Sequence, residues 1–383
     1  MKIKIKTRLG VFLPLLLCTQ MPLFSQIVRA SEAIRDPYNT YQWDGKTASW
    51  YEWWYYKLVL PESKKAYYFV YGVVNPADKS GALTASRSYV GFGDFEKKQI
   101  LEEKRSAADF TASRNVTQVT VGDLGTATDR HLSGRLTEGT TTVTWDLSVE
   151  PDWKFNAMGW GMHFDFLSNI YWYPAQASAV MNGWIESRQK TDNQREDGVN
   201  VVEVKNAPAY QDRNWGRSFP KWWTWLVSNH FPASPGTVLA AGGGRPKIFN
   251  RHELFDGVVI GLRHEGHEFT FRPTDGDRVH VNVDFGHWEV EGENDHGEKI
   301  VISAYAPQDQ FLDIPFITPQ GETFHDYEAL LGHMNVKLYR NVGWFREKWE
   351  LVADLDTDAA GIEYGSFHEL NPTSVFTGRQ VIF

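Results

Sequence analysis

Two aromatic hairpin-like segments constrain what this chain can fold into more than any other feature. The first, Glu52-Trp53-Trp54-Tyr55-Tyr56, leads through a proline to a second apolar strand that ends at Val74. The second, Trp222 to Val227, leads through a Pro- and Ser-containing turn to the run Val238 to Gly242. Aromatic and β-branched residues bounded by Pro, Gly and Ser are typical of strands joined by turns. Because a long series of strand signals follows each hairpin, the sequence predicts two β domains.

Further strand signals lie at residues 54–60, 66–74, 141–149, 279–283 and 299–304. No segment longer than about a dozen residues, a usual helix length, shows clear helical periodicity, and Asp326 to Leu331 is the best candidate for a short helix. The charged stretch Arg188 to Gly198 indicates a solvated hairpin loop. At 383 residues the chain exceeds what one core normally organises. We therefore expect an all-β protein with two β-barrel or sandwich domains in tandem, residues 31–206 and 207–383, meeting near Asn206-Ala207-Pro208.

Composition and charge exclude several classes of function. The net charge of −9, with no cluster of Lys and Arg beyond the first residues, argues against a nucleic-acid partner. Gly242-Gly243-Gly244 is followed by Arg245-Pro246, which cannot open a phosphate-binding helix, and no nucleotide or redox cofactor motif is found. The 16 Trp residues indicate large flat cores, an aromatic-lined cavity, or both. The expected partner is a hydrophobic small molecule, with peripheral membrane contact as a route for its access.

The first 30 residues resemble a secretory signal peptide. Lys and Arg occupy positions 2, 4, 6 and 8, the apolar core runs from Val11 to Leu17, and Val28-Arg29-Ala30 is a permissive cleavage site. Cleavage after Ala30 predicts a secreted or periplasmic protein. It would also remove Cys18, the only cysteine, so that disulfides, thiol catalysis and cysteine-bound metals are excluded from the mature chain.

The segment from Ala209 to Trp225 contains the best candidate for catalysis. It places Tyr210 and Asp212 beside Asn214 and then a dense run of indoles. A carboxyl group among aromatic rings is desolvated, which favours its neutral, proton-donating form. Aromatic faces can in turn stabilise a cation after the proton is given away. The alternative is an Asp that fixes a loop by hydrogen bonds to backbone N–H groups.

Several of these segments resemble the tocopherol cyclase family, a relative of bacterial carotenoid 1,2-hydratases and of fungal lipocalin-like pericyclases. The resemblance runs in order from about Pro37 to Gly365. The matching segments are Tyr51 to Tyr56, Tyr71 to Pro76, Gly183-Trp184-Ile185-Glu186, Ala207 to Tyr210, Asp212 to Gly216, Phe219-Pro220, Trp223-Thr224-Trp225 and Ala241 to Gly244.

The resemblance implies two lipocalin-like β domains and a lipophilic site between or within them. It implies ring closure of a prenylated aromatic or other isoprenoid, without a redox cofactor. Asp212 would protonate an alkene, and Tyr210 and Asn214 would position the acid or receive a proton. The expected lining residues are Trp54, Tyr55, Trp160, Trp184, Trp215 and Trp223. A hydratase, a pericyclase and a non-catalytic carrier remain alternatives. Unlike plant members, this chain has a secretory leader, and Ser187 stands where the family often has Trp.

For the other charged residues, a structural and a functional interpretation are compared. Glu52 and Glu186 adjoin Trp in apolar strands, where an unpaired carboxylate is costly. Glu52 is expected to have a structural role, whereas Glu186 is either a structural residue or a second catalytic acid. His264 and His267 are the closest approach to a metal site, but at i and i+3 of one strand they would face opposite sides, so no metal is expected. His163 and Asp165 share a face and form an acid dyad or a surface pair.

Overall fold

The computed structural model describes residues 36–78, 86–190, 196–249, 251–253 and 256–370. The expected signal peptide, residues 1–30, therefore lies outside the described residues. The described part of the chain contains strands and short 3₁₀ turns and no α-helix, and hence no helix that could cross a membrane. The 3₁₀ turns are η1 (Pro37–Asn39), η2 (Pro61–Ser63), η3 (Ala107–Asp109), η4 (Gly159–His163), η5 (Pro273–Asp275) and η6 (Gln308–Gln310).

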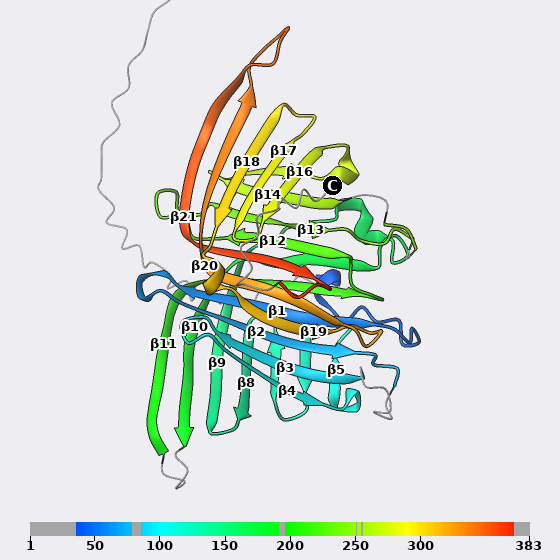
Figure 1. Ribbon diagram of the computed structural model, residues 1–383, viewed down its shortest axis with the longest axis vertical. Helices are drawn as coiled ribbons and strands as arrows, with labels where there is room; N and C mark the ends of the chain where they lie inside the picture. Colours follow the sequence, from blue (N-terminus) through cyan, green and yellow to red (C-terminus); the bar gives the residue numbers. More distant parts are fainter. Residues whose placement is uncertain (1–35, 79–85, 191–195, 250, 254–255, 371–383) are drawn as a thin grey trace, which may run out of the picture. The chain divides into compact units, whose positions relative to one another are not determined.

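The first sheet has eleven antiparallel strands in the order β4-β3-β2-β1-β11-β10-β9-β8-β7-β6-β5 (Figure 1). Its strands are β1 (Tyr51–Leu60), β2 (Lys65–Val74), β3 (Arg87–Asp94), β4 (Gln99–Arg105), β5 (Phe110–Ala112), β6 (Gln118–Val121), β7 (Gly125–Thr128), β8 (His131–Glu138), β9 (Thr141–Trp153), β10 (Ile170–Lys190) and β11 (Glu196–Gly216).

The second sheet follows the order β15-β14-β13-β12-β21-β20-β18-β17-β16, with β19 paired to β20. Its strands are β12 (Trp222–Ser228), β13 (Val238–Gly244), β14 (Gly257–His264), β15 (His267–Phe271), β16 (Arg278–Asp284), β17 (His287–Glu293), β18 (Glu298–Tyr305), β19 (Leu312–Ile317), β20 (Thr323–Asn341) and β21 (Trp349–Ser366). Both sheets are nearly closed and barrel-like, which confirms the expected all-β fold with two barrels in tandem. The hairpins β1–β2 and β12–β13 open the two sheets, as expected.

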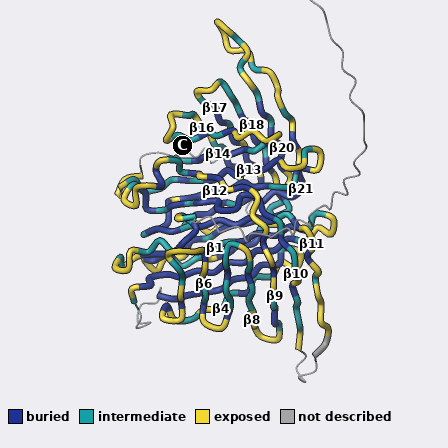
Figure 2. The backbone as a smooth tube through the Cα atoms, turned by 180° about the vertical axis from the view of Figure 1, so that it is seen from behind, coloured by how far each residue is buried: buried dark blue, intermediate teal, exposed yellow. Residues whose placement is uncertain are grey.

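Strand alternation divides most of the buried aromatic residues among three large cores, and a fourth, smaller cluster contains Tyr171 and Trp215. On β1, Trp54 and Tyr56 pack inside the first barrel. Trp53 points the other way, into a cluster that also contains Trp223 and Trp225 of β12. A separate core fills the second barrel around Trp288. Because side chains alternate between the faces of a strand, each hairpin serves its own barrel with one face and the contact between the sheets with the other. Buried backbone is accordingly continuous where the two sheets meet (Figure 2).

The passage between the sheets lies further along the chain than Asn206. Strand β11 runs through Asn206 without a break to Gly216, and the second sheet begins at Trp222. Asn206 has a φ of 47°, and its N–H donates to the side chain of Asn182, where the pairing of β10 and β11 shifts register. The Asn-Ala-Pro signal thus marks a β-bulge, which places one extra residue in a strand and bends it.

The short helix expected from Asp326 to Leu331 was wrong, because these residues lie within strand β20. Nearly every residue of this stretch is buried, on both faces of the strand. A strand buried on both sides loses the alternation of polar and apolar residues, so its sequence cannot be told from a buried helical turn. The predicted loop at 188–198 overlaps the ends of β10 and β11, which pair up to Lys190 and Glu196.

Candidate active site between the two sheets

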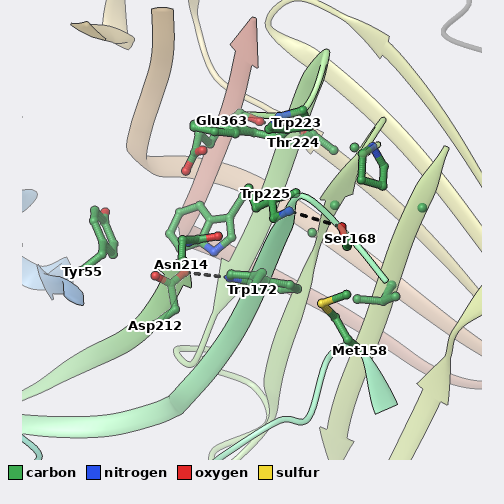
Figure 3. Close-up of a pocket in the computed structure, with 18 of the residues that line it drawn as sticks. Tyr55, Met158, Ser168, Trp172, Asp212, Asn214, Trp223, Thr224, Trp225 and Glu363 are labelled. Atoms are coloured by element: carbon green, nitrogen blue, oxygen red, sulfur yellow. Dashed lines mark hydrogen bonds between the residues drawn. The ribbon is translucent and has the colours of Figure 1, made fainter. Parts of the chain in front are cut away.

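A cavity of about 410 Å³ lies where the two sheets meet. Its walls are mainly apolar and aromatic, and side chains of both sheets contribute (Figure 3). The first sheet supplies Trp53, Tyr55, Tyr68, Val70, Glu102, Trp172, Asp212 and Asn214, and the second supplies Trp223, Thr224, Trp225, Val259, Ile314, Phe316, Asp326, Glu328 and Glu363. An apolar cavity of this size with a few convergent polar groups is typical of a small-molecule site.

Asp212 is buried in the wall of this cavity, with 4% of its surface exposed. Its Oδ2 accepts two hydrogen bonds, from Trp172 Nε1 at 2.8 Å and from the Tyr210 hydroxyl at 2.9 Å. Its Oδ1 has no partner among the residues that the structure describes. Burial raises the pKa of Asp212 to about 7, against the opposing effect of the two hydrogen bonds and Arg213. The carboxyl group is therefore substantially protonated near neutral pH.

The direction of the Tyr210 hydrogen bond follows from its other contact. Trp225 Nε1 donates to the Tyr210 oxygen at 3.1 Å, so the one hydroxyl proton of Tyr210 is free to go to Asp212. When Asp212 is neutral, Oδ2, which accepts both donors, is its carbonyl oxygen. The transferable proton of Asp212 then belongs on Oδ1, the oxygen without a protein partner.

Trp172 reaches Asp212 because Gly242 leaves room for its ring. A side chain at Gly242 would begin 3.0 Å from the Trp172 indole. The glycine-rich end of β13 thus accommodates an indole from the first sheet. Through this contact, β13 of the second sheet packs directly against the cavity wall that contains Asp212.

Three more carboxyl groups line the cavity from the second sheet. Asp326 accepts a hydrogen bond from Trp223 Nε1 at 3.0 Å and another from the Glu363 carboxyl. Burial raises the pKa of Asp326 to about 7 and raises the pKa of Glu363 well above its usual range. Glu328 accepts a hydrogen bond from the Tyr55 hydroxyl of the first sheet, and its pKa is also raised well above the usual range by burial. In Figure 3, Glu363 and Trp223 lie on one side of the cavity and Asp212 and Trp172 on the other.

These three carboxyl groups were missed in the sequence. Strand pairing brings Glu363 opposite Glu328, and Trp225 opposite Glu363, across three adjacent strands. The available signal was the spacing Asp326-x-Glu328 within an apolar run, which puts both carboxyls on one face of a strand. A buried lysine was also missed: Lys57 lies near Glu328, and burial lowers its pKa to about 7.

The structure brings together some of the predicted site residues. Asp212, Asn214, Tyr55, Trp160 and Trp223 all line the cavity. Tyr210 lies behind Asp212 and contacts it directly.

The other predicted site residues lie elsewhere. Glu186 is on the far part of β10, where it pairs with Arg188 at 2.6 Å, and Trp184 is 38% exposed on the outside of the first barrel. Trp54 is in the core of the first barrel, and Trp215 stacks on Tyr171 in a separate cluster. Alternation accounts for the last two, because Trp54 and Trp215 face away from the side on which Tyr55, Asp212 and Asn214 lie.

The remaining charged candidates have structural contacts. Glu52 is fully buried and forms an ion pair with Arg213, in line with the structural role expected for it. His264 and His267 face each other across the β14–β15 hairpin, rather than pointing to opposite sides of one strand, and His264 Nδ1 lies 3.0 Å from the Thr237 hydroxyl. His163 pairs with the Tyr38 hydroxyl at 2.8 Å. Within the described ranges, no three His, Cys, Asp or Glu side chains form a metal-binding group.

Comparisons with known proteins agree with this architecture. The family model described as tocopherol cyclase-like matches residues 83–366. A probable chloroplastic tocopherol cyclase of Oryza sativa subsp. japonica is 26% identical over 325 residues, 71% of this chain and just under two thirds (66%) of the rice protein. The chloroplastic tocopherol cyclase of Zea mays is 26% identical over 386 residues, 87% of this chain and 78% of that protein.

Among solved structures, CghA has a similar fold. The TM-score is 0.50 and the sequence identity 13%, with 84% of this chain and 90% of CghA covered. With three quarters of the chain matched by one family model, the present chain belongs to the tocopherol cyclase-like family, a family of cyclase-like enzymes.

Proposed function

We propose that this protein closes a ring on a prenylated aromatic or another isoprenoid, with Asp212 as the acid that protonates the alkene. The observation that carries the proposal is the environment of Asp212: a carboxyl group buried in an aromatic cavity, whose donors among the described residues both lie on Oδ2 and none on Oδ1. The family membership and the names of the rice and maize relatives support the same chemistry.

Protonation of a trisubstituted alkene gives a tertiary cation, and the cavity is suited to stabilise it. Trp53, Trp172, Trp223 and Trp225 all line the space into which the substrate would bind. A cation over a desolvated indole face gains about 1–2 kcal/mol for each well-placed ring. The walls thus favour the charge that develops after proton transfer, which is the condition for lowering the barrier.

Ring closure requires that a hydroxyl group of the substrate reach the cation before water does. A hydroxyl held in the same cavity has a high effective concentration, because its approach costs no further loss of translational freedom. The apolar walls keep bulk water from the cation. An admitted water molecule would give the hydrated alcohol in place of the ring.

The proposal is tested with a synthetic hydroquinone that carries one prenyl chain, incubated with the protein in D₂O. We expect the cyclised product to carry one deuterium on the former alkene carbon. Asp212→Asn should lower the rate by about two to four orders of magnitude, the usual contribution of a general acid. The variant should still fold and bind, because an amide can keep both hydrogen bonds to Oδ2.

Each alternative gives a different result in the same experiment. A hydratase would release the tertiary alcohol, a pericyclase would form a ring without deuterium, and a carrier would return the substrate unchanged. Full activity of Asp212→Asn would remove Asp212 from the mechanism.

A further inference from the structure

The cavity contains a second, separate acid–base group on the wall opposite Asp212. Asp326 on β20 and Glu363 on β21 share a hydrogen bond, and both side chains line the cavity. Neither forms an ion pair with a Lys, Arg or His among the residues that the structure describes. Polar groups buried in this way are costly unless they are hydrogen-bonded or serve a partner.

We propose that Asp326 is the base that binds the substrate's attacking hydroxyl and receives its proton during ring closure. This inference rests on the proposed function. It assigns the step that Asp212 does not perform, the removal of the proton from the attacking hydroxyl. Asp212 would transfer its proton to the alkene carbon. The hydroxyl oxygen would then form the new C–O bond, its O–H bond would break, and that proton would pass to Asp326.

The contacts of Asp326 identify it as the ionised member of the pair. Trp223 donates its indole N–H to Asp326 Oδ1 at 3.0 Å, and the Glu363 carboxyl donates its proton to the same residue. Within this pair, both hydrogen bonds favour the anionic form of Asp326, whereas the bond to Asp326 favours the protonated form of Glu363. Glu363 is the donor and therefore the protonated member. Asp326 can thus accept a proton while Glu363 keeps its own.

Gly365 allows the contact between Trp223 and Asp326. A Cβ at Gly365 would lie 2.4 Å from Trp223 Nε1, and Gly365 is the strand neighbour of both Trp223 and Asp326. The indole crosses over this glycine to reach the carboxyl group. On both walls of the cavity, an indole N–H thus donates to a buried Asp. Asp212 is the acid on one wall, and Asp326 is the base on the other.

The proton balance closes over one turnover. After ring closure Asp212 lacks a proton and Asp326 has gained one, so the protein's total is unchanged. Water that enters when the product leaves can carry the proton from Asp326 back to Asp212. The substrate and product are isomers, and the scheme needs no oxidant or other reactant.

The test is the fate of the cation in Asp326→Asn. If Asp326 takes the hydroxyl proton, its loss slows ring closure after the alkene has been protonated. With the same prenylated hydroquinone in D₂O, we expect cyclised product to fall at least tenfold. Deuterium should then appear in recovered substrate and in isomerised alkene. Asp326→Glu should restore ring formation, and Glu363→Gln, which keeps an N–H donor to Asp326, should lower it less than Asp326→Asn.

The matched control is Glu186→Gln. Glu186 is partly buried on the far part of β10, outside the cavity, where it pairs with Arg188 at 2.6 Å, so its replacement should leave the product ratio unchanged. Should Asp326→Asn fail to fold, Trp223→Phe removes the donor to Asp326 and leaves the carboxyl in place, and the product ratio should shift in the same direction.

The outcomes separate this inference from the proposed function. A wild-type protein that forms no deuterated ring contradicts both. In the other case, the wild-type protein forms the deuterated ring, Asp212→Asn is inactive, and Asp326→Asn is unchanged in rate and product ratio. This result overturns only the role of Asp326, and the hydroxyl proton would then pass directly to Asp212.

Discussion

Trp172 Nε1 lies 2.8 Å from Asp212 Oδ2, and this contact joins an indole of β10 to the acid of β11. It has an electrostatic consequence. A donor on a carboxyl oxygen stabilises the anion, and it therefore holds the pKa of Asp212 below the value that burial alone would give. The indole tunes the acid to about neutral pH while orienting it, which makes Trp172 a positioning residue.

The first prediction concerns the pH dependence of activity. Asp212 must be protonated to act as an acid, so kcat/KM should fall as the pH rises through about 7. In Trp172→Phe one donor to Oδ2 is lost, the pKa of Asp212 rises, and this alkaline limb should move to higher pH. Trp160→Phe is the control, since Trp160 also lines the cavity but donates to the Thr274 carbonyl. An unmoved limb in Trp172→Phe would show that another group controls it.

The second prediction links the same pKa to stability. Folded Asp212 keeps a proton up to about pH 7, whereas in the unfolded chain it loses it near pH 4. Between these values the folded state binds more protons, so its stability falls as the pH rises. At about 1.4 kcal/mol per pKa unit, the stability of Asp212→Asn relative to wild type should improve by on the order of 4 kcal/mol from pH 4 to pH 8.

Urea unfolding of the two proteins at both pH values measures this difference. Asp309→Asn is the control: its side chain is 79% exposed, and it should show no comparable change. A difference between wild type and Asp212→Asn that stays constant with pH would mean that folding does not raise the pKa of Asp212.

The fold was largely predictable because strands and hairpins are encoded locally. The aromatic hairpins, the turns between strands and the absence of helical periodicity all gave correct predictions. The bend at Asn206 was not predicted, because a β-bulge and a domain boundary can carry the same Asn-Ala-Pro signal. Only the continuous pairing of β10 with β11 distinguishes the two. The buried stretch Asp326 to Leu331 of β20 shows no alternation of polar and apolar residues from which a strand could have been predicted.

The site was predictable in part. Tyr210, Asp212 and Asn214 alternate along one strand, so one local segment places the acid, its positioning residue and an amide on one face. The same rule, applied to Trp54 and Trp215, would have removed both from the lining. Asp326 and Glu363 lie more than 100 residues from Asp212 in the sequence, and only the meeting of the two sheets brings them to one cavity.

The third prediction concerns Gly365. Gly365→Ala places a methyl carbon 2.4 Å from the Trp223 indole nitrogen, so the ring must move and its hydrogen bond to Asp326 is lost. We expect lower stability and loss of ring formation. In the Trp223→Phe background the smaller ring has no N–H to lose, so Gly365→Ala should cost less, although Phe324 Cε1 still lies 2.5 Å from the new Cβ. A double-mutant cycle that measures both effects should therefore be non-additive, and full additivity would show that the glycine acts elsewhere.

The fourth prediction concerns the fully buried ion pair of Glu52 and Arg213. The Arg213 guanidinium lies 3.8 Å from the Trp54 ring and donates to the Thr40 carbonyl at 2.6 Å. Glu52 accepts the backbone N–H of Gln42 at 2.8 Å, so the pair ties the segment before β1 to the first barrel. Glu52→Gln leaves Arg213 charged and buried without a counterion, which typically costs about 3–5 kcal/mol.

Calorimetric or urea unfolding should show this loss for Glu52→Gln, while the folded fraction keeps its activity, because neither residue lines the cavity. Replacing both partners, as Glu52→Gln with Arg213→Met, removes the uncompensated charge and should recover part of the stability, since an unpaired buried ion costs more than a missing pair. The opposite result is a loss of unfolding free energy in the double variant that exceeds the sum of the losses in the two single variants. In that case the broken ion pair is not the reason that each single change is costly. The contacts of Arg213 to the backbone of the segment before β1 would then be the main source of stability.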